Sequence, residues 1–230
     1  METKSKPRIE VMLDLETTGI QENAGIIEIA MYPFFLDGKK TDIVPFHKYI
    51  DLVSCWFEGM NFEPKTQEWW MRQDPRAKWA IRRGEKTDIR DAVRQSNEWL
   101  TSLCGEYEVH LWCRGLNFDI PKYERCIRMM LEERTPYDWW NLEDARTYAH
   151  TFDVHNADIL FEGIQHLASD DCQHQIRIIQ EAYRRKHSMQ HYAAKAIISE
   201  YKDDRSNFLK IWKETFGESL TEKEAESILN

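Results

Sequence analysis

Residues 9–19 read IEVMLDLETTG, an apolar run rich in large and β-branched side chains that closes on two acids and a Thr-Thr-Gly turn. This composition predicts a buried β-strand that the turn ends. Side chains two apart in a strand point to the same side, so Asp14 and Glu16 converge while Leu15 faces the other way. Two carboxylates this close repel each other, and oxygen-rich sites suit Mg²⁺ or Mn²⁺ rather than zinc. Taken alone, a motif of this kind is more often a solvated turn.

The rest of the chain alternates strand-like and helix-like segments. Further strands are predicted after this opening one, and the first three form an antiparallel meander. Helical periodicity predicts helices between and after the later strands. The expected strands are 26–35, 43–52, 109–113 and 137–142, and the expected helical segments lie within 64–104, 119–131 and 169–185. These segments predict an α/β fold with a sheet flanked by helices.

Length and pattern suggest one domain with additions at both ends. We expect a flexible leader over 1–7, the main domain over 8–185 and a helical C-terminal extension over 186–230, with short helices. Thr221 and Glu224 form a capping box for the last of these helices. Two roles are open for the extension: it covers the domain's own core, or it contacts a partner such as a second copy in a homodimer.

Composition limits the classes of function. The chain has 230 residues, 42% hydrophobic and 31% charged, with a formal charge of −9. A protein that coats duplex DNA is usually basic, so we expect a small nucleic-acid footprint at most. The five cysteines form no C-x-x-C, and no run of about 18 apolar residues occurs. We therefore expect reduced thiols, no membrane contact and a cytoplasmic location, which is the host cytoplasm if a phage encodes the chain.

Two more acidic elements follow in the sequence. Asp119, in Asn-Phe-Asp, comes just after the fourth predicted strand, where a plain N-cap is the alternative interpretation. His166 lies shortly before a predicted helix that carries Asp171 in its first turn. A histidine beside a carboxylate can act as a general base near neutral pH, although such a pair is more often structural.

The three elements together resemble the DEDDh branch of the 3′–5′ exonucleases. The matching motifs are D-L-E-T-T-G at 14–19, N-F-D at 117–119 and H-L-A-S-D-D at 166–171. A sister branch has Tyr where this chain has Leu167. The resemblance spans about 8–185 and is closest to the phage DexA-type exodeoxyribonucleases and the RNase AS enzymes, through PKTQEWWMRQ at 64–73 and EDART at 143–147. It implies an RNase H-like mixed five-stranded sheet.

The resemblance also implies roles for the residues. Asp14, Glu16, Asp119 and Asp171 would hold two Mg²⁺ or Mn²⁺ ions, with Asp14 shared between them, and His166 would be the general base. The product would be a nucleoside 5′-monophosphate. Expected substrate contacts are Leu15 against the last base, Thr17, Thr18 and Gly19 through backbone groups at the 3′-hydroxyl, and Asn117. Two arginines are further candidates: Arg72 for a phosphate, because residues 65–94 are locally basic, and Arg146, which could instead orient a catalytic carboxylate or pair with Asp144. Asp170 should point to solvent, and Trp69, Trp70, Trp139 and Trp140 are expected in the core. The alternative for the basic segment with Trp69, Trp70 and Trp79 is that it guides a single strand and stacks on its bases.

The predicted activity is therefore 3′–5′ hydrolysis of single-stranded DNA from its 3′ end. RNA 3′ ends are the alternative substrate, since a single group can recognise the 2′-hydroxyl. Two other classes stay open: a phosphodiesterase for a dinucleotide or second messenger, and a non-catalytic nucleic-acid-binding module. The complete acid set disfavours the binder, which would gain nothing from four repelling carboxylates.

Overall fold

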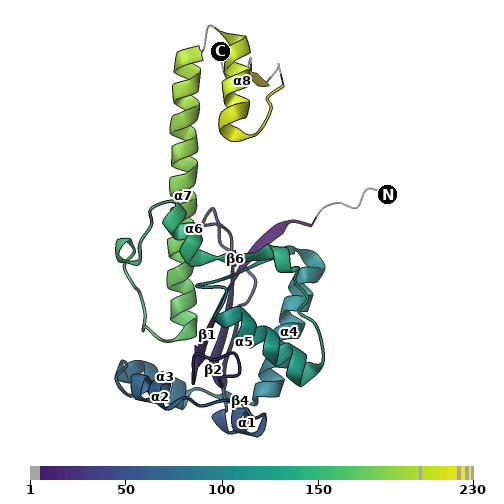
Figure 1. Cartoon of the computed structure of the whole chain (residues 1–230), viewed down its shortest axis with the longest axis vertical. Coiled ribbons are helices and arrows are strands. Elements are labelled where there is room, and N and C mark those ends of the chain that lie inside the picture. The colour runs from purple at the N-terminus through teal and green to yellow at the C-terminus, as the bar shows by residue number, and fades with distance from the viewer. Residues whose placement is uncertain (1–5, 202–203, 222–223, 226–227, 229–230) are drawn as a thin grey trace. The chain divides into compact units, whose positions relative to one another are not determined.

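The computed structural model describes residues 6–201, 204–221, 224–225 and 228, so most of the expected leader lies outside the described residues. The chain divides into two compact units, Met1–Glu181 and Ala182–Asn230. Unit 1 is built on a six-stranded sheet in the order β4-β3-β2-β1-β5-β6 (Figure 1). No helix in the described part of the chain is long and apolar enough to cross a membrane.

The sheet is mixed. Its strands are β1 (Arg8–Thr17), β2 (Ile26–Phe34), β3 (Phe46–Ile50), β4 (Lys86–Thr87), β5 (Glu108–Cys113) and β6 (Leu142–Asp144). β1, β2 and β3 form the predicted antiparallel meander, while β1 pairs with β5, β5 with β6 and β3 with β4 in parallel. The five-stranded count is too low because β4 has only two residues. A strand this short has no alternating pattern that a sequence could reveal.

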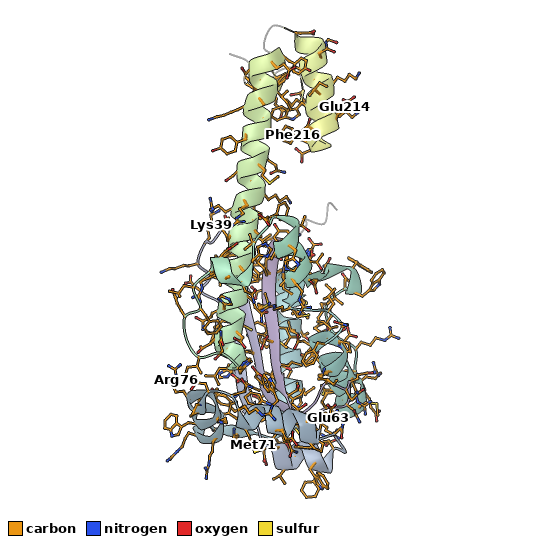
Figure 2. The ribbon with its side chains drawn as sticks, turned by 60° about the vertical axis from the view of Figure 1, so that its left-hand side comes forward. Lys39, Glu63, Met71, Arg76, Glu214 and Phe216 are labelled. Atoms are coloured by element: carbon orange, nitrogen blue, oxygen red, sulfur yellow. The ribbon has the colours of Figure 1, made fainter. Side chains whose placement is uncertain are left out.

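Helices cover both faces of the sheet. The helices of unit 1 are α1 (Leu52–Phe57), α2 (Pro64–Met71), α3 (Pro75–Arg83), α4 (Ile89–Glu106), α5 (Asp119–Cys126), α6 (Ala145–Thr151) and the first part of α7 (Ala168–Tyr201). A π-helical turn (Ile127–Leu131) continues α5, and short 3-10 turns lie at Trp139–Asn141 and Asn156–Asp158. Figure 2 draws the side chains of these elements, with Met71 of α2 and Arg76 of α3 labelled.

Successive side chains of β1 point to opposite faces of the sheet and contribute to two separate apolar clusters. Ile9, Val11, Leu13 and Leu15 join the larger apolar cluster with α4 and α5. Met12 joins the smaller cluster with residues of α6 and α7. Even-numbered side chains of β1 therefore lie on the α7 face of the sheet.

Two expectations about the later chain are wrong. α7 continues to Tyr201 where short helices were expected after residue 186, because no Gly or Pro interrupts it. Trp139 and Trp140 are exposed rather than in the core, stacked edge to face at 5.5 Å between ring centroids.

Unit 2 has a small apolar core of its own. The second part of α7 and α8 (Arg205–Phe216) contribute Ile197 and Phe208, and Ala225 joins them. The predicted capping box is confirmed: Thr221 N–H donates to Glu224 Oε2 at 2.8 Å, and Glu224 N–H donates to Thr221 Oγ1 at 3.3 Å.

Candidate active site

One cavity of about 640 Å³ in unit 1 is lined by all five side chains predicted to act in catalysis. Asp14 and Glu16 come from the last part of β1, and Asp119 is the first residue of α5. His166 lies in the loop before α7, and Asp171 lies in the first turn of that helix. The volume lies within the range of small-ligand sites. The fold thus brings three distant segments of chain to one place.

The backbone of β1 fixes two of these acids. Leu15 is buried in the larger core cluster, so the side chains of its two neighbours lie on the opposite, α7 side of the sheet. The Leu15 N–H donates to Asp119 Oδ1 at 3.3 Å, which ties the first turn of α5 to β1. Asp14 Oδ1 accepts a hydrogen bond of 2.8 Å from Gln175 Nε2 on α7.

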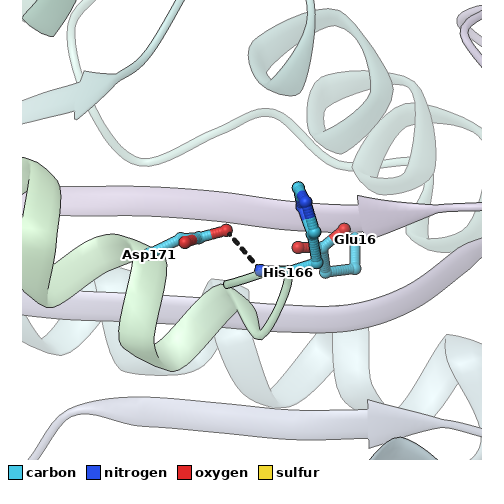
Figure 3. A group of neighbouring side chains, drawn as sticks. All are labelled: Glu16, His166 and Asp171. Carbon is cyan, nitrogen blue, oxygen red and sulfur yellow. Dashed lines mark hydrogen bonds between the residues drawn. The ribbon is translucent and has the colours of Figure 1, made fainter. Parts of the chain in front are cut away.

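Glu16, His166 and Asp171 each present one ligand atom within 4.8 Å of the others (Figure 3). His166 has a φ of 66°, in the left-handed region that non-glycine residues rarely adopt. Its main-chain N–H donates to Asp171 Oδ2 at 3.1 Å, which holds this conformation. Asp170, expected to face solvent, instead accepts a 2.7 Å bond from the Ile164 N–H and so fixes the same loop.

Burial raises the pKa of every carboxyl group in the cluster. Burial first, and then the neighbouring carboxylates, raise the pKa of Asp14 and of Glu16 well above their usual values. Burial raises the pKa of Asp119 to about 7 and that of Asp171 to about 6. Burial also lowers the pKa of His166, which favours its neutral form. The site therefore holds negative charge at a cost that a cation would relieve.

The chemistry of these donors fits a hard divalent cation. Four carboxylates supply only oxygen ligands, the kind that Mg²⁺ and Mn²⁺ prefer. The Gln175 Oε1 and Glu28 Oε2 atoms are buried, and neither has a hydrogen-bond partner in the described part of the chain. Glu28 is opposite Glu16 in the β1–β2 register. Buried acceptors without a partner, beside a cluster of carboxylates, fit a site that holds a cation.

Arg114, His174 and Gln175 also line the cavity with polar or charged side chains, and the sequence motifs did not predict them. Arg114 directly follows β5, three residues before Asn-Phe-Asp, so its position after a strand was a usable signal. His174 and Gln175 lie in α7, on the turn that follows Asp171. Residues three and four positions after Asp171 lie on the same face of the helix, so their spacing was also a usable signal. None of the three residues forms a recognisable motif by itself.

The expected substrate contacts are dispersed. Leu15 lines the cavity. The Thr17 carbonyl accepts a 3.0 Å bond from Trp70 Nε1, and the Thr18 N–H donates to the Gly25 carbonyl at 2.8 Å, so these backbone groups are engaged within the protein. Gly19 has the Glu63 side chain against its Cα, in the space that a Cβ would fill.

The remaining three expected contacts lie outside the cavity lining. Asn117 is exposed. Arg72 is exposed and has its guanidinium 3.9 Å from Glu68. Arg146 lines a smaller neighbouring cavity, which shares Arg114 and Gln175 with the first.

Trp69 is 41% exposed, so its assignment to the core is wrong. Its ring meets the His166 ring edge to face, with 4.8 Å between centroids and 75° between planes. Trp70 is half-buried, and its bond to the Thr17 carbonyl holds α2 against the end of β1. The spacing of apolar residues in a sequence cannot distinguish a tryptophan in the core from one that packs on a functional histidine, since the ring makes apolar contacts in both places.

The fold and the ordered set of four acids and one histidine define a class, the DEDDh 3′–5′ exonucleases with an RNase H-like fold, whose members are metal-dependent nucleic-acid phosphodiester hydrolases. The model of the Rv2179c-like 3′–5′ exoribonuclease domain matches residues 9–183, and the chain belongs to this family.

Individual relatives are more distant. An exodeoxyribonuclease of Enterobacteria phage T4 is 26% identical over 159 residues, which are 60% of this chain and 69% of the phage protein. Exonuclease I of E. coli, solved with a dT13 oligonucleotide, has a TM-score of 0.51 at 13% identity, over 82% of this chain and 43% of that one. Exonuclease I from Methylocaldum szegediense gives the same four values. The chain thus spans less than half of the exonuclease I chains, and this similarity concerns the fold alone.

Proposed function

We propose that the chain is a metal-dependent 3′–5′ exonuclease that releases nucleoside 5′-monophosphates one at a time from single-stranded DNA. The observation that carries this proposal is the cavity on which four carboxylates and one imidazole from three segments converge. The phage T4 relative is named an exodeoxyribonuclease, which supports DNA as the substrate.

Asp14, Glu16, Asp119 and Asp171 would hold the metal, as two Mg²⁺ or Mn²⁺ ions per site. Such ions, when bound, stabilise the attacking and leaving oxygens of an in-line displacement at phosphorus. The Gln175 amide orients Asp14 through its 2.8 Å bond. The Leu15 N–H orients Asp119 in the same way at 3.3 Å.

His166 would accept the proton of the attacking water at a ring nitrogen. Its lowered pKa keeps the imidazole neutral, and therefore able to accept, near pH 7. The water oxygen then bonds to phosphorus, the P–O3′ bond breaks, and the 3′ oxygen stays on the shortened strand and takes a proton from solvent, while His166 releases its proton to solvent. Arg114 lines the same cavity and supplies positive charge that can contact the phosphate.

RNA is the second candidate substrate, because the family is described as an exoribonuclease domain. The choice depends on whether the site accepts or rejects a 2′-hydroxyl, which one side chain or backbone group can decide. The domain boundary at 185/186, the homodimer and the cytoplasmic location stay predictions, as do the substrate contacts of Asn117, Arg72 and Arg146.

A direct test digests 5′-labelled DNA and RNA oligomers of equal sequence, from dinucleotide to 20-mer, with Mg²⁺, Mn²⁺ or chelator. A ladder of shortened DNA that chelator abolishes is the expected result. A ladder on RNA alone would transfer the proposal to the second candidate. Cleavage of dinucleotides alone would indicate the phosphodiesterase, and no cleavage of any oligomer would indicate the binding module.

Two variants locate the activity in this cavity. Asp171→Asn should be inactive, since it removes one ligand charge at nearly constant shape. Asp42→Asn makes the same change at an exposed carboxylate outside the cavity and should keep full activity. Equal activity of the two variants would contradict the assignment of the site.

A further inference from the structure

The α2–α3 pair, residues 64–83, is a basic segment in an acidic protein. It contains six Lys or Arg and two Asp or Glu, whereas the whole chain has a formal charge of −9. A local excess of positive charge against that background attracts polyanions to one place. The question is whether these charges are available to a ligand and where they lie relative to the cavity.

The two acids of this pair neutralise only part of the charge. Asp74 caps α3 and holds Arg76 through two guanidinium nitrogens, at 3.0 and 2.8 Å from its Oδ2. Lys65, Arg82 and Arg83 are exposed, and none lies within ion-pair distance of a carboxylate among the residues that the structure describes. Arg82 and Arg83 form the last turn of α3, where cations also face the helix's own carbonyl end.

The same pair exposes apolar surface in place of burying it. α2 buries no residue, and α3 buries only Ala77. Trp79 is 64% exposed, and the Arg83 guanidinium lies 5.9 Å from the centroid of its ring. An exposed tryptophan beside unpaired arginines is poor as a core element. It is the combination that binds single-stranded nucleic acid, in which bases stack on the ring and phosphates contact the cations.

The pair is fixed at the catalytic cavity. Trp70 Nε1 donates to the Thr17 carbonyl at the end of β1, and Glu63, the N-cap residue of α2, accepts from the Ile20 and Gln21 N–H groups at 3.0 and 3.1 Å. Trp69 reaches the His166 ring. The basic and aromatic surface therefore begins where the 3′ end of a substrate would react.

We infer that the α2–α3 pair binds the single-stranded nucleic acid on the 5′ side of its last two nucleotides, with Trp79 stacking on a base and Lys65, Arg82 and Arg83 contacting phosphates. This inference rests on the proposed exonuclease function. It names the path of the strand outside the cavity. Figure 2 shows the α2–α3 region, where Met71 and Arg76 are labelled.

The test separates this surface from catalysis by two measurements. The first is the binding of a fluorescent 20-mer of dT in chelator, where no turnover occurs. Trp79→Ala should weaken it about 5- to 100-fold, the range for one lost base–aromatic stack. Arg82→Gln with Arg83→Gln should weaken it about tenfold and reduce the slope of log affinity against log salt by about 1.4, since each phosphate contact on a single strand contributes ~0.7.

The second measurement is hydrolysis of a dinucleotide, which is too short to reach Trp79 and the α3 cations. Both variants should match the unmodified protein there. Lys40→Gln with Arg134→Gln, an equal charge change at exposed sites outside the pair, should leave binding and hydrolysis unchanged.

Two results would overturn the inference while the enzyme stays active: 20-mer binding and salt slope equal to those of the charge-matched control, or an equal loss on dinucleotide and 20-mer. If the protein hydrolyses no substrate but binds the 20-mer in a way that depends on Trp79, the proposed exonuclease activity is wrong and the proposed binding surface is supported. Folding of each variant is checked by its thermal unfolding temperature.

Discussion

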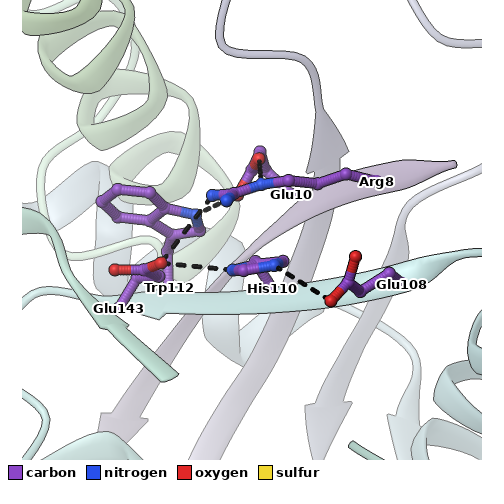
Figure 4. A network of polar contacts seen from close by, with 6 residues as sticks. All are labelled: Arg8, Glu10, Glu108, His110, Trp112 and Glu143. Atoms are coloured by element: carbon purple, nitrogen blue, oxygen red, sulfur yellow. Dashed lines mark hydrogen bonds and ion pairs between the residues drawn. The ribbon is translucent and has the colours of Figure 1, made fainter. Parts of the chain in front are cut away.

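Glu10 and the Asp14–Glu16 pair lie along the same strand and on the same face, yet their surroundings are opposite. Glu10, near the start of β1, is 3% exposed. The Arg8 guanidinium donates to both of its oxygens, and Trp112 Nε1 donates to Oε2 at 2.6 Å (Figure 4). Four residues further along β1, Asp14 receives one neutral amide, from Gln175.

The pairing continues across the sheet at the Glu10 end. His110 on β5 lies 3.2 Å from Glu143 on β6 and 4.0 Å from Glu108, and Arg8 lies 3.7 Å from Glu143. Acids and bases alternate there. At the other end of β1, Asp14, Glu16, Asp119 and Asp171 have no ion pair within 4.0 Å among the described residues.

This contrast separates a structural from a functional use of buried charge. Compensated acids at the start of β1 hold three strands together. Uncompensated acids at its end raise one another's pKa and weaken the fold, a cost expected where charge is kept for a cation and a phosphate. Four substitutions can break or sharpen this distinction.

The largest effect is expected for Asp14→Asn. Losing one ligand charge should reduce turnover at least ~10³-fold, since several kcal/mol of transition-state stabilisation depend on the metal. In chelator the variant should be more stable than the unmodified protein at pH 7, because a repulsion and the burial of a charge are removed. Initial rates and urea unfolding measure the two effects. A variant that is both inactive and strongly destabilised would make Asp14 a structural residue like Glu10.

Glu10→Ala should show the opposite combination. Truncation leaves the Trp112 N–H and the Arg8 guanidinium without their acceptor, and we expect a loss of about 2–4 kcal/mol in unfolding free energy. Activity per folded molecule should stay near that of the unmodified protein, because no group of this network lines the cavity. Glu10→Gln keeps an acceptor for Trp112 and should lose less. A tenfold fall in kcat without a loss of stability would refute the separation.

A pH series on Asp119→Asn tests the acid cluster itself. Asp119 titrates at about 7 in the folded protein, whereas an unfolded aspartate titrates near ~4. Below about pH 4, Asp119 is protonated in both the folded and the unfolded protein, so it does not lower the free energy of unfolding. Between pH 4 and 7 the carboxyl group ionises more readily in the unfolded protein, so the free energy of unfolding falls as pH rises. In chelator, the advantage of the variant should therefore grow over this window by roughly 2–4 kcal/mol. An advantage that does not change with pH would show that Asp119 is not strained by its surroundings.

The sequence predicts this contrast unequally. D-x-E at the end of an apolar run predicts two converging carboxylates, because the strand period of two acts locally. That Asp119, His166 and Asp171 join them is implied by the resemblance to the DEDDh exonucleases and by no local pattern. The Glu10 network extends beyond what a local pattern shows: Arg8 lies two residues away on the same strand, but the other partners come from β5 and β6, and only the register joins them. Gln175 and Arg114 lie next to predicted elements, but no motif marks them. β4 and the full length of α7 depend on pairing and on the absence of breakers rather than on periodicity.

The smallest effect concerns Trp69, which connects the α2–α3 surface to the cluster. Its ring contacts the His166 ring at 4.8 Å, and that histidine lies in a loop with a left-handed backbone. Trp69→Ala should let the imidazole rotate and lower kcat on a dinucleotide about tenfold, a part of the ~10²–10⁴ that a general base contributes, with KM nearly unchanged. Trp69→Phe keeps an aromatic edge and should recover most of kcat. Trp79→Ala removes the same bulk from an exposed site and should leave dinucleotide kcat unaltered. If instead KM rises while kcat holds, Trp69 binds the terminal base rather than positioning His166, and the aromatic surface extends into the cavity itself.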